Sequence, residues 1–183
     1  MVYIFLANGF EEIEALYTVD VLRRAGVDIK TIGVDSSTIT GSHKITIECD
    51  LCTKKLKVDD NFEMIILPGG MPGSKNLDQN PVVNEFIEFA HKHDKFICAI
   101  CAAPFILGKR NLLSGKKATC FPGFENQLYG AEVSDCGCVR DGKIITARAM
   151  GSAHEFAFEI LKALKGESTA EAIKDSIILD MEI

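Results

Sequence analysis

The chain has 183 residues, of which 47% are hydrophobic and 25% are charged. We expect one domain spanning residues 1–183, because domains usually contain about 100–200 residues. The composition excludes a disordered, collagen-like or coiled-coil protein. The 20 Lys and Arg residues against 26 Asp and Glu give a net charge of -6. With no basic run to neutralise phosphates, the sequence argues against a nucleic-acid partner.

The cellular compartment is predicted from two further features. No stretch approaches the ~20 apolar residues of a membrane helix, and the apolar start at residues 2–7 lacks the preceding basic segment of an export signal. We therefore expect a cytoplasmic protein without a membrane partner. The 7 cysteines, an odd number, are then expected to be free thiols.

Apolar runs typical of strands alternate with helical patterns along the chain. This order predicts an α/β fold with a mostly parallel sheet and helices on both faces. The expected strands cover residues 2–7, 27–34, 64–67, 96–100 and 143–147, and the expected helices cover residues 11–25, 81–93, 103–107, 152–164 and 169–174. Between Ile39 and Cys49, the turn residues Gly41 and Ser42 predict a β-hairpin appended to the sheet.

Three turns follow predicted strands directly, at residues 8–12, 68–73 and 99–104. Ligands of parallel sheets bind at the carboxyl ends of the strands, so these turns are the first candidates for a site. In the third turn, Cys101 has only small neighbours and precedes a predicted helix, which is the arrangement of a nucleophile elbow. We expect this thiol to ionise readily. One helix end contributes only ~0.3–1 kcal/mol, so a second donor is required.

Glu14 is a candidate for that donor. On a helix beginning near Glu11, the neighbours of Glu14 in helical projection are apolar or uncharged. The Glu14 carboxyl is therefore expected to face away from solvent. A protonated, desolvated carboxyl could donate a hydrogen bond to a thiolate. Asp20 is the second candidate, and the sequence does not rank the two decisively. Glu11 and Glu12 fit the first turn of this helix, where the helix dipole stabilises negative charge.

Gly69 and Gly70 allow a close backbone approach to a ligand. The N–H groups of Gly70 and Ala102 could form a two-donor oxyanion hole, although a plain turn would use the same glycines. Cys98 fits a core position in a strand.

Elsewhere the sequence predicts neither a metal site nor a cofactor. Cys49 and Cys52 have no second Cys/His pair at zinc-site spacing. The histidines at positions 91, 93 and 154 fit ordinary helix positions.

Four motifs in order resemble the ThiJ/PfpI superfamily and, within it, the DJ-one branch, over nearly the whole chain. They are GFEEIE at residues 9–14, VDVLRRAG at residues 19–26, LPGG at residues 67–70 and ICAAP at residues 100–104. The resemblance implies a flavodoxin-like three-layer sandwich and a homodimer formed through the first helix. It matches Cys101 to the elbow cysteine and Glu14 to its carboxyl partner.

The resemblance also matches Gly70 and Ala102 to the oxyanion donors and Asp20 to an acid near the pocket. Three positions depart from relatives. Ala102 replaces the histidine of the protease-like branches, which argues against peptidase activity. Phe121 stands where some relatives have a histidine near the pocket, which removes one potential acid/base and leaves Glu14 with more of the proton transfer. His43 stands where some relatives have arginine, so substrate or anion preference is expected to differ.

The leading hypothesis is a cofactor-independent enzyme acting on reactive α-oxoaldehydes, as a glutathione-independent glyoxalase or deglycase. Cys101 would form a hemithioacetal and Glu14 would move the proton. The alternative is an oxidative-stress sensor or chaperone in which Cys101 is oxidised to sulfinate. A role in thiamine metabolism, an old label of the superfamily, has no support in the residues.

Overall fold

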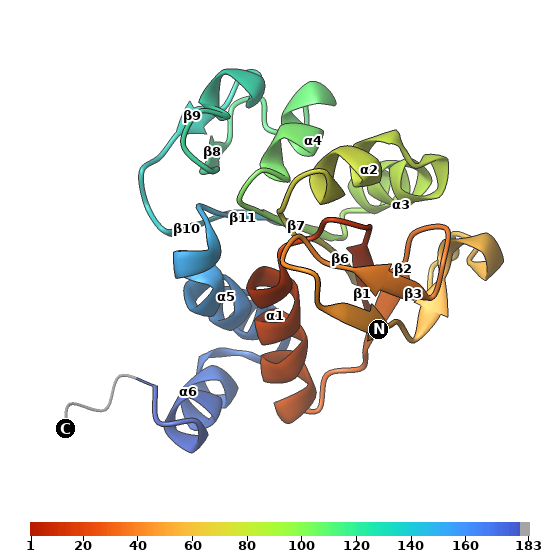
Figure 1. Ribbon diagram of the computed structural model, residues 1–183. Helices are drawn as coiled ribbons and strands as arrows, with labels where there is room; N and C mark the ends of the chain where they lie inside the picture. The colour runs from red at the N-terminus through yellow and green to blue at the C-terminus, as the bar shows by residue number, and fades with distance from the viewer. Residues whose placement is uncertain (180–183) are drawn as a thin grey trace.

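The computed structural model describes residues 1–179, and a parallel sheet forms its centre (Figure 1). In the described chain this sheet has seven strands in the order β10-β11-β7-β6-β1-β2-β5. All neighbouring strands are parallel except β10 and β11. The strands are β1 (Val2–Leu6), β2 (Ile29–Gly33), β5 (Leu51–Cys52), β6 (Met64–Leu67), β7 (Phe96–Ile100), β10 (Cys138–Asp141) and β11 (Ile144–Ala147).

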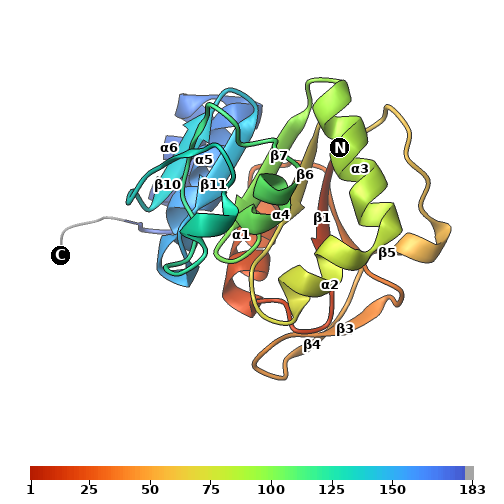
Figure 2. The same ribbon diagram turned by 90° about the horizontal axis from the view of Figure 1, so that it is seen from above.

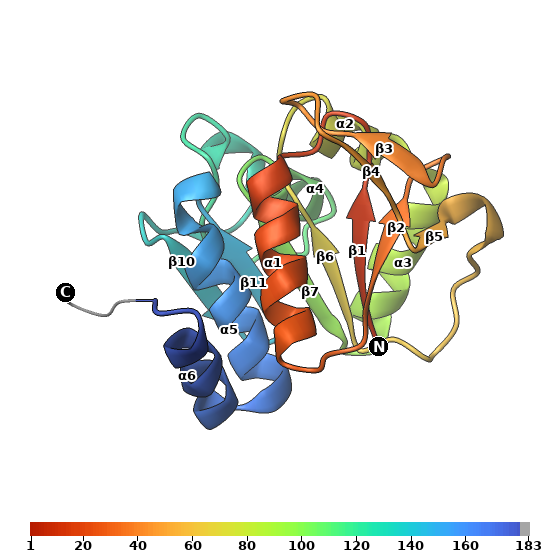
Figure 3. The same cartoon turned by 60° about the horizontal axis from the view of Figure 1, so that its bottom comes forward.

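Helices cover both faces of the sheet, as predicted. On one face α1 (Glu12–Arg24) lies beside α5 (Ala153–Lys165), with α6 (Glu167–Ser176) at its edge (Figure 3). The other face carries α2 (Gly73–Gln79), α3 (Pro81–Lys92) and α4 (Pro104–Lys109), and Figure 2 shows α3 alongside β6 and β1. In the described residues, no helix combines the length and hydrophobicity needed to span a bilayer.

The strand β1 explains why the sequence shows continuous apolar runs. Its five residues are all buried. Tyr3 and Phe5 pack in the core below α3, whereas Val2, Ile4 and Leu6 pack in the core below α1 and α5. Successive side chains point to opposite faces, so a strand covered on both sides has no polar alternation. Burying each large side chain stabilises the fold by ~1.5–3 kcal/mol.

The predicted hairpin is formed by β3 (Thr38–Thr40) and β4 (Thr46–Glu48), which pair antiparallel. It makes a two-stranded sheet of its own and does not hydrogen-bond into the central sheet. The hairpin instead lies over the beginning of α1, because backbone bonds join Gly9 to Thr40 and Ser42 to Phe10.

The shorter elements and the antiparallel edge strand were not predicted from the sequence. β10 is followed by Gly142, which has a φ of +61° in a two-residue turn before β11. An Asp-Gly pair between two apolar segments is a hairpin signal that could have located β10. The missed elements were α2, β5, β8 (Lys117–Ala118), β9 (Glu132–Val133), β10 and the 3-10 turns η1 (Thr53–Lys55), η2 (Glu125–Gln127) and η3 (Met150–Ser152).

Candidate active site

Cys101 occupies a strained turn at the carboxyl end of β7. Its φ is +64°, in the left-handed region that residues with a Cβ rarely adopt. Two backbone bonds hold the turn: the Cys101 N–H donates to the Ala147 carbonyl at 2.9 Å, and the Phe121 N–H donates to the Cys101 carbonyl at 2.8 Å. Strain of this kind persists only where the surroundings enforce it, and it often marks a functional site.

Glu14 reaches this turn from the first turns of α1. The residue is 1% exposed, and its Oε2 accepts a hydrogen bond of 2.8 Å from the Gly69 N–H. A hydrogen bond with the Cys101 thiol also acts on this carboxyl. The other carboxyl oxygen, Oε1, is buried and has no hydrogen-bond partner among the described residues. The site therefore contains a buried carboxyl that contacts the Cys101 thiol and keeps one oxygen without a hydrogen-bond partner.

Gly69 is required by the space that Glu14 and Cys101 fill. A methyl group at this position would lie 2.5 Å from the Cys101 Cβ and 3.0 Å from its Sγ, and it would overlap Glu14. Gly70 has a φ of +85°. Its backbone N–H and that of Ala102 both hydrogen-bond the Cys101 sulfur and favour its ionised form. The two expected oxyanion donors thus converge on the same atom.

The electrostatics couple Glu14 to Cys101. Burial raises the pKa of Glu14 to about 7, with a smaller upward contribution from Glu11, while the hydrogen bonds from Cys101 and Gly69 oppose the rise. Burial and the neighbouring Glu14 carboxylate raise the pKa of the Cys101 thiol to about 12, against the two backbone N–H groups.

The expectation of a readily ionised thiol is therefore wrong for the state in which Glu14 is a carboxylate. A negative neighbour and desolvation both disfavour a second negative charge. When Glu14 holds the proton, however, that repulsion is absent and the carboxyl becomes a donor. Because Glu14 has the lower pKa, it loses its proton before the thiol does, and a carboxylate beside a neutral thiol predominates above about pH 7. The thiolate forms as the minor tautomer in which the thiol proton has moved to Glu14.

Asp20 does not join this group. Its side chain is 62% exposed and forms an ion pair of 2.6 Å with Arg24. Six residues of helix separate it from Glu14, a rise of about 9 Å along the axis. The helical projection predicted Asp20 as a candidate because it lies near Ile13, Leu16 and Tyr17, but the structure places its carboxylate in solvent.

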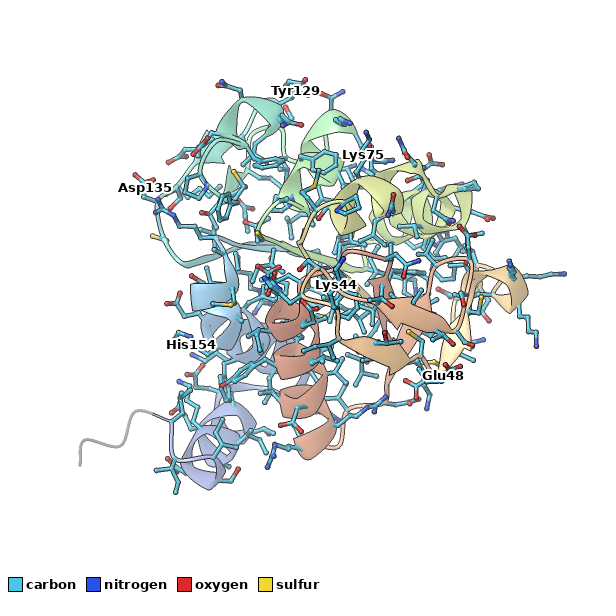
Figure 4. The ribbon with its side chains drawn as sticks, viewed as in Figure 1. Lys44, Glu48, Lys75, Tyr129, Asp135 and His154 are labelled. Carbon is cyan, nitrogen blue, oxygen red and sulfur yellow. The ribbon has the colours of Figure 1, made fainter. Side chains whose placement is uncertain are left out.

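Glu12 is a buried carboxylate that was not predicted from the sequence. The residue is 2% exposed and accepts bonds from the His43 N–H at 2.7 Å and from the His43 Nδ1 at 3.0 Å. Although burial opposes it, these hydrogen bonds lower the pKa of Glu12. The same contact, together with the charges of Glu11 and Glu12, raises the pKa of His43. Glu12 therefore fastens the β3-β4 hairpin to α1, and Lys44 marks this junction in Figure 4.

The same three side chains are the candidate metal ligands. One ligand atom each from Glu11, Glu12 and His43 lies within 4.8 Å of the others. The Glu12 oxygens, however, are already engaged by hairpin N–H groups and by the Ser42 hydroxyl at 3.2 Å. The Glu12 oxygens thus hold the hairpin against α1, and we assign no metal to these three residues.

The other candidates lie apart from the Cys101 turn. Cys98 is 0% exposed in β7, and burial raises its pKa well above the usual value. His93 stacks on Phe89 at 4.0 Å between ring centres, and His154 lies at the start of α5 beside Glu155.

Comparison with known proteins places the chain in a family. The DJ-1/PfpI family model matches residues 1–163. The chain is 32% identical over 179 residues to protein dj-1beta of Drosophila melanogaster, covering 96% of this chain and 95% of that protein. The crystal structure of Drosophila DJ-1beta superimposes with a TM-score of 0.92 over 98% of both chains.

Two further relatives bear on function. A deglycase of Pyrococcus abyssi is 29% identical over 167 residues, covering 90% of this chain and 99% of that protein. The structure of oxidized Toxoplasma gondii DJ-1 has a TM-score of 0.93 at 27% identity, covering 98% of both chains. The matches span the described fold and the Cys101 turn. The chain belongs to the DJ-1/PfpI family.

Proposed function

We propose that the protein is a cofactor-independent enzyme that converts reactive α-oxoaldehydes into hydroxy acids, with deglycation as the related activity. The observation that carries this proposal is the buried Glu14 carboxyl, whose pKa is raised to about 7, beside the strained Cys101 turn. The similarity to the Pyrococcus deglycase supports the deglycase side of the proposal.

The first step is addition of sulfur to the aldehyde. With the shared proton on Glu14, the Cys101 thiolate attacks the aldehyde carbon, forming a C–S bond and breaking the carbonyl π bond. The N–H groups of Gly70 and Ala102, which hydrogen-bond the sulfur at rest, are positioned to stabilise the resulting oxyanion. Protonation of that oxygen by Glu14 gives a neutral hemithioacetal and a carboxylate.

The second step uses the carboxylate as a base. Glu14 removes the hydrogen from the former aldehyde carbon and returns a proton to the adjacent carbon, giving a thioester. Water then cleaves the C–S bond, releasing the hydroxy acid and restoring the thiol. The overall change adds one water to methylglyoxal to give lactic acid, without an oxidant or reductant. A pKa of about 7 suits Glu14 to both acid and base roles.

Lactate production from methylglyoxal tests this function. The wild type should form lactate, whereas Cys101→Ala and Glu14→Gln should lose at least about a hundredfold in kcat/KM, since each removes a reacting group. Cys136→Ala is the matched control because it removes an exposed thiol outside the Cys101 turn. An active Cys101→Ala variant would contradict the proposal.

A second candidate function is redox sensing through Cys101. This sulfur is partly exposed, whereas Cys98 is fully buried, and the similar Toxoplasma structure is that of an oxidized DJ-1. Two equivalents of hydrogen peroxide, each reduced to water, would convert the Cys101 thiol through the sulfenic acid to a sulfinate that protonated Glu14 can hydrogen-bond. Peptide mass spectrometry after mild peroxide should find the added oxygens on Cys101; equal oxidation of Cys98 would count against this role.

The proposed assembly is a homodimer formed through α1. Ile13 on this helix is 50% exposed, and Leu16 and Tyr17 are only partly buried. A second copy covering this face would bury apolar surface that the monomer leaves in water. Light scattering should report a dimer for the wild type and a monomer for Ile13→Glu. A monomeric wild type would overturn the assignment.

A further inference from the structure

Two large apolar side chains border the Cys101 turn and remain exposed. Met71 directly follows the donor Gly70 and is 50% exposed. Phe121 is 43% exposed, and its N–H is bonded to the Cys101 carbonyl. One residue is thus covalently joined to an oxyanion donor, and the other is hydrogen-bonded to the nucleophile's own backbone.

Neither side chain packs in the hydrophobic core. Met71 and Phe121 belong to neither hydrophobic core of the described chain, although Phe124 packs against the core below α3. Phe124 contacts the Phe105 ring, while within residues 1–179 no ring contact involves Phe121. The Phe121 ring packs in neither core, and its backbone is bonded to Cys101. This exposed ring is therefore available to contact a bound molecule.

The polar groups around the sulfur are committed to the reacting atoms. The main influences on the Cys101 sulfur are Glu14 and the N–H groups of Gly70 and Ala102. None of these polar groups is a cation. The chain brings Met71 and Phe121 to the two backbone segments that flank the sulfur, one after Gly70 and the other bonded to the Cys101 carbonyl.

We infer that the site prefers α-oxoaldehydes with an aromatic substituent, the arylglyoxals, and that Phe121 and Met71 bind the substituent. The inference rests on the proposed function and deepens it by naming a substrate class. Phenylglyoxal would follow the same balanced route: one water is added, the C–S bond forms and breaks, and mandelic acid is released. Face or edge contact with the Phe121 ring supplies the selectivity.

Competition between two aldehydes tests the preference. The measured quantity is the kcat/KM ratio of phenylglyoxal to methylglyoxal, in each variant relative to the wild type, so that intrinsic reactivity cancels. Phe121→Ala should lower this ratio about fivefold to tenfold, the range expected for losing an aromatic contact. Met71→Ala should lower it less, and Phe121→Tyr should retain it. Thermal unfolding of each variant verifies that the fold is intact.

Tyr129→Ala is the matched control. Tyr129 is 52% exposed, and Figure 4 places it at the far tip of the segment that follows β8. This variant should keep the wild-type ratio. An unchanged ratio in Phe121→Ala, or an equal loss in Tyr129→Ala, would overturn the inference.

A binding measurement separates this inference from the proposed function. Mandelate and lactate are compared as agents that slow alkylation of Cys101 by iodoacetamide. Mandelate should protect at about fivefold lower concentration than lactate in the wild type, and this difference should disappear in Phe121→Ala. Preferential protection without any aldehyde conversion would refute the proposed function but support the aromatic subsite. Conversion without preference would refute the subsite alone.

Discussion

The substitution Glu14→Gln should stabilise the protein at neutral pH while removing its activity. Glutamine keeps a carbonyl oxygen for the Gly69 N–H, which lies 2.8 Å from Oε2, but it cannot ionise. Burial raises the pKa of Glu14 from 4.5 to about 7. The folded state therefore resists losing a proton that the unfolded state readily loses.

The sign and size of the effect follow from this difference. Below the unfolded pKa both states are protonated, and the native carboxyl imposes no penalty. As the pH rises to about 7, the unfolded state gains stability by ionising, and the folded protein loses about 3 kcal/mol at about 1.4 kcal/mol per pKa unit. Glu14→Gln removes this loss.

Urea unfolding at two pH values measures the prediction. Near pH 8 the variant should be more stable than the wild type by about 3 kcal/mol, and near pH 4.5 the two should agree within about 0.5 kcal/mol. A variant that is equally stable or less stable near pH 8, or a difference independent of pH, would refute the assigned burial penalty.

Two further substitutions test the packing around the site. Gly69→Ala would place a methyl 2.5 Å from the Cys101 Cβ and overlap Glu14, so overpacking should destabilise the protein by about 1–3 kcal/mol and abolish lactate formation; a fully active, equally stable variant would contradict this packing. Glu12→Gln should destabilise by about 1–3 kcal/mol, because an amide NH₂ would face the hairpin donors. This loss should be greatest above the ordinary carboxyl pKa and should shrink on acidification through the lowered pKa of Glu12. NMR titration should also find the pKa of His43 falling in Glu12→Gln, and an unchanged His43 titration would argue against the contact.

The sequence predicted those features that depend on short-range patterns. The apolar runs at β1, β6 and β7 identified the buried parallel strands, because both faces of each strand are covered. The small neighbours of Cys101 identified the strained turn, and the uncharged neighbours of Glu14 on its helix identified a buried carboxyl.

Features that depend on distant segments were not predictable. Glu12 looked like an exposed charge at a helix start, because the hairpin that buries it lies about thirty residues later. Asp20 has neighbours similar to those of Glu14 in projection, but no strand end faces it. Strands of two residues, such as β8 and β9, carry too little pattern to detect. The direction in which the pKa of Cys101 shifts could not be predicted without knowing where the Glu14 carboxyl lies.

The proton shared between Glu14 and Cys101 is tested most directly by the rate of Cys101 alkylation as a function of pH. Peptide mass spectrometry after iodoacetamide treatment, from about pH 5 to about pH 10, reports this rate separately from the other cysteines. In the wild type the rate should rise through an apparent pKa of about 7 to a plateau, because loss of one proton from the pair allows the thiol proton to move to Glu14 in a fixed minor fraction of molecules. Glu14→Gln should lack this step and show a single rise at higher pH. A wild-type profile with one step at the pKa of an ordinary thiol, or a step near neutrality that survives in Glu14→Gln, would contradict the shared proton.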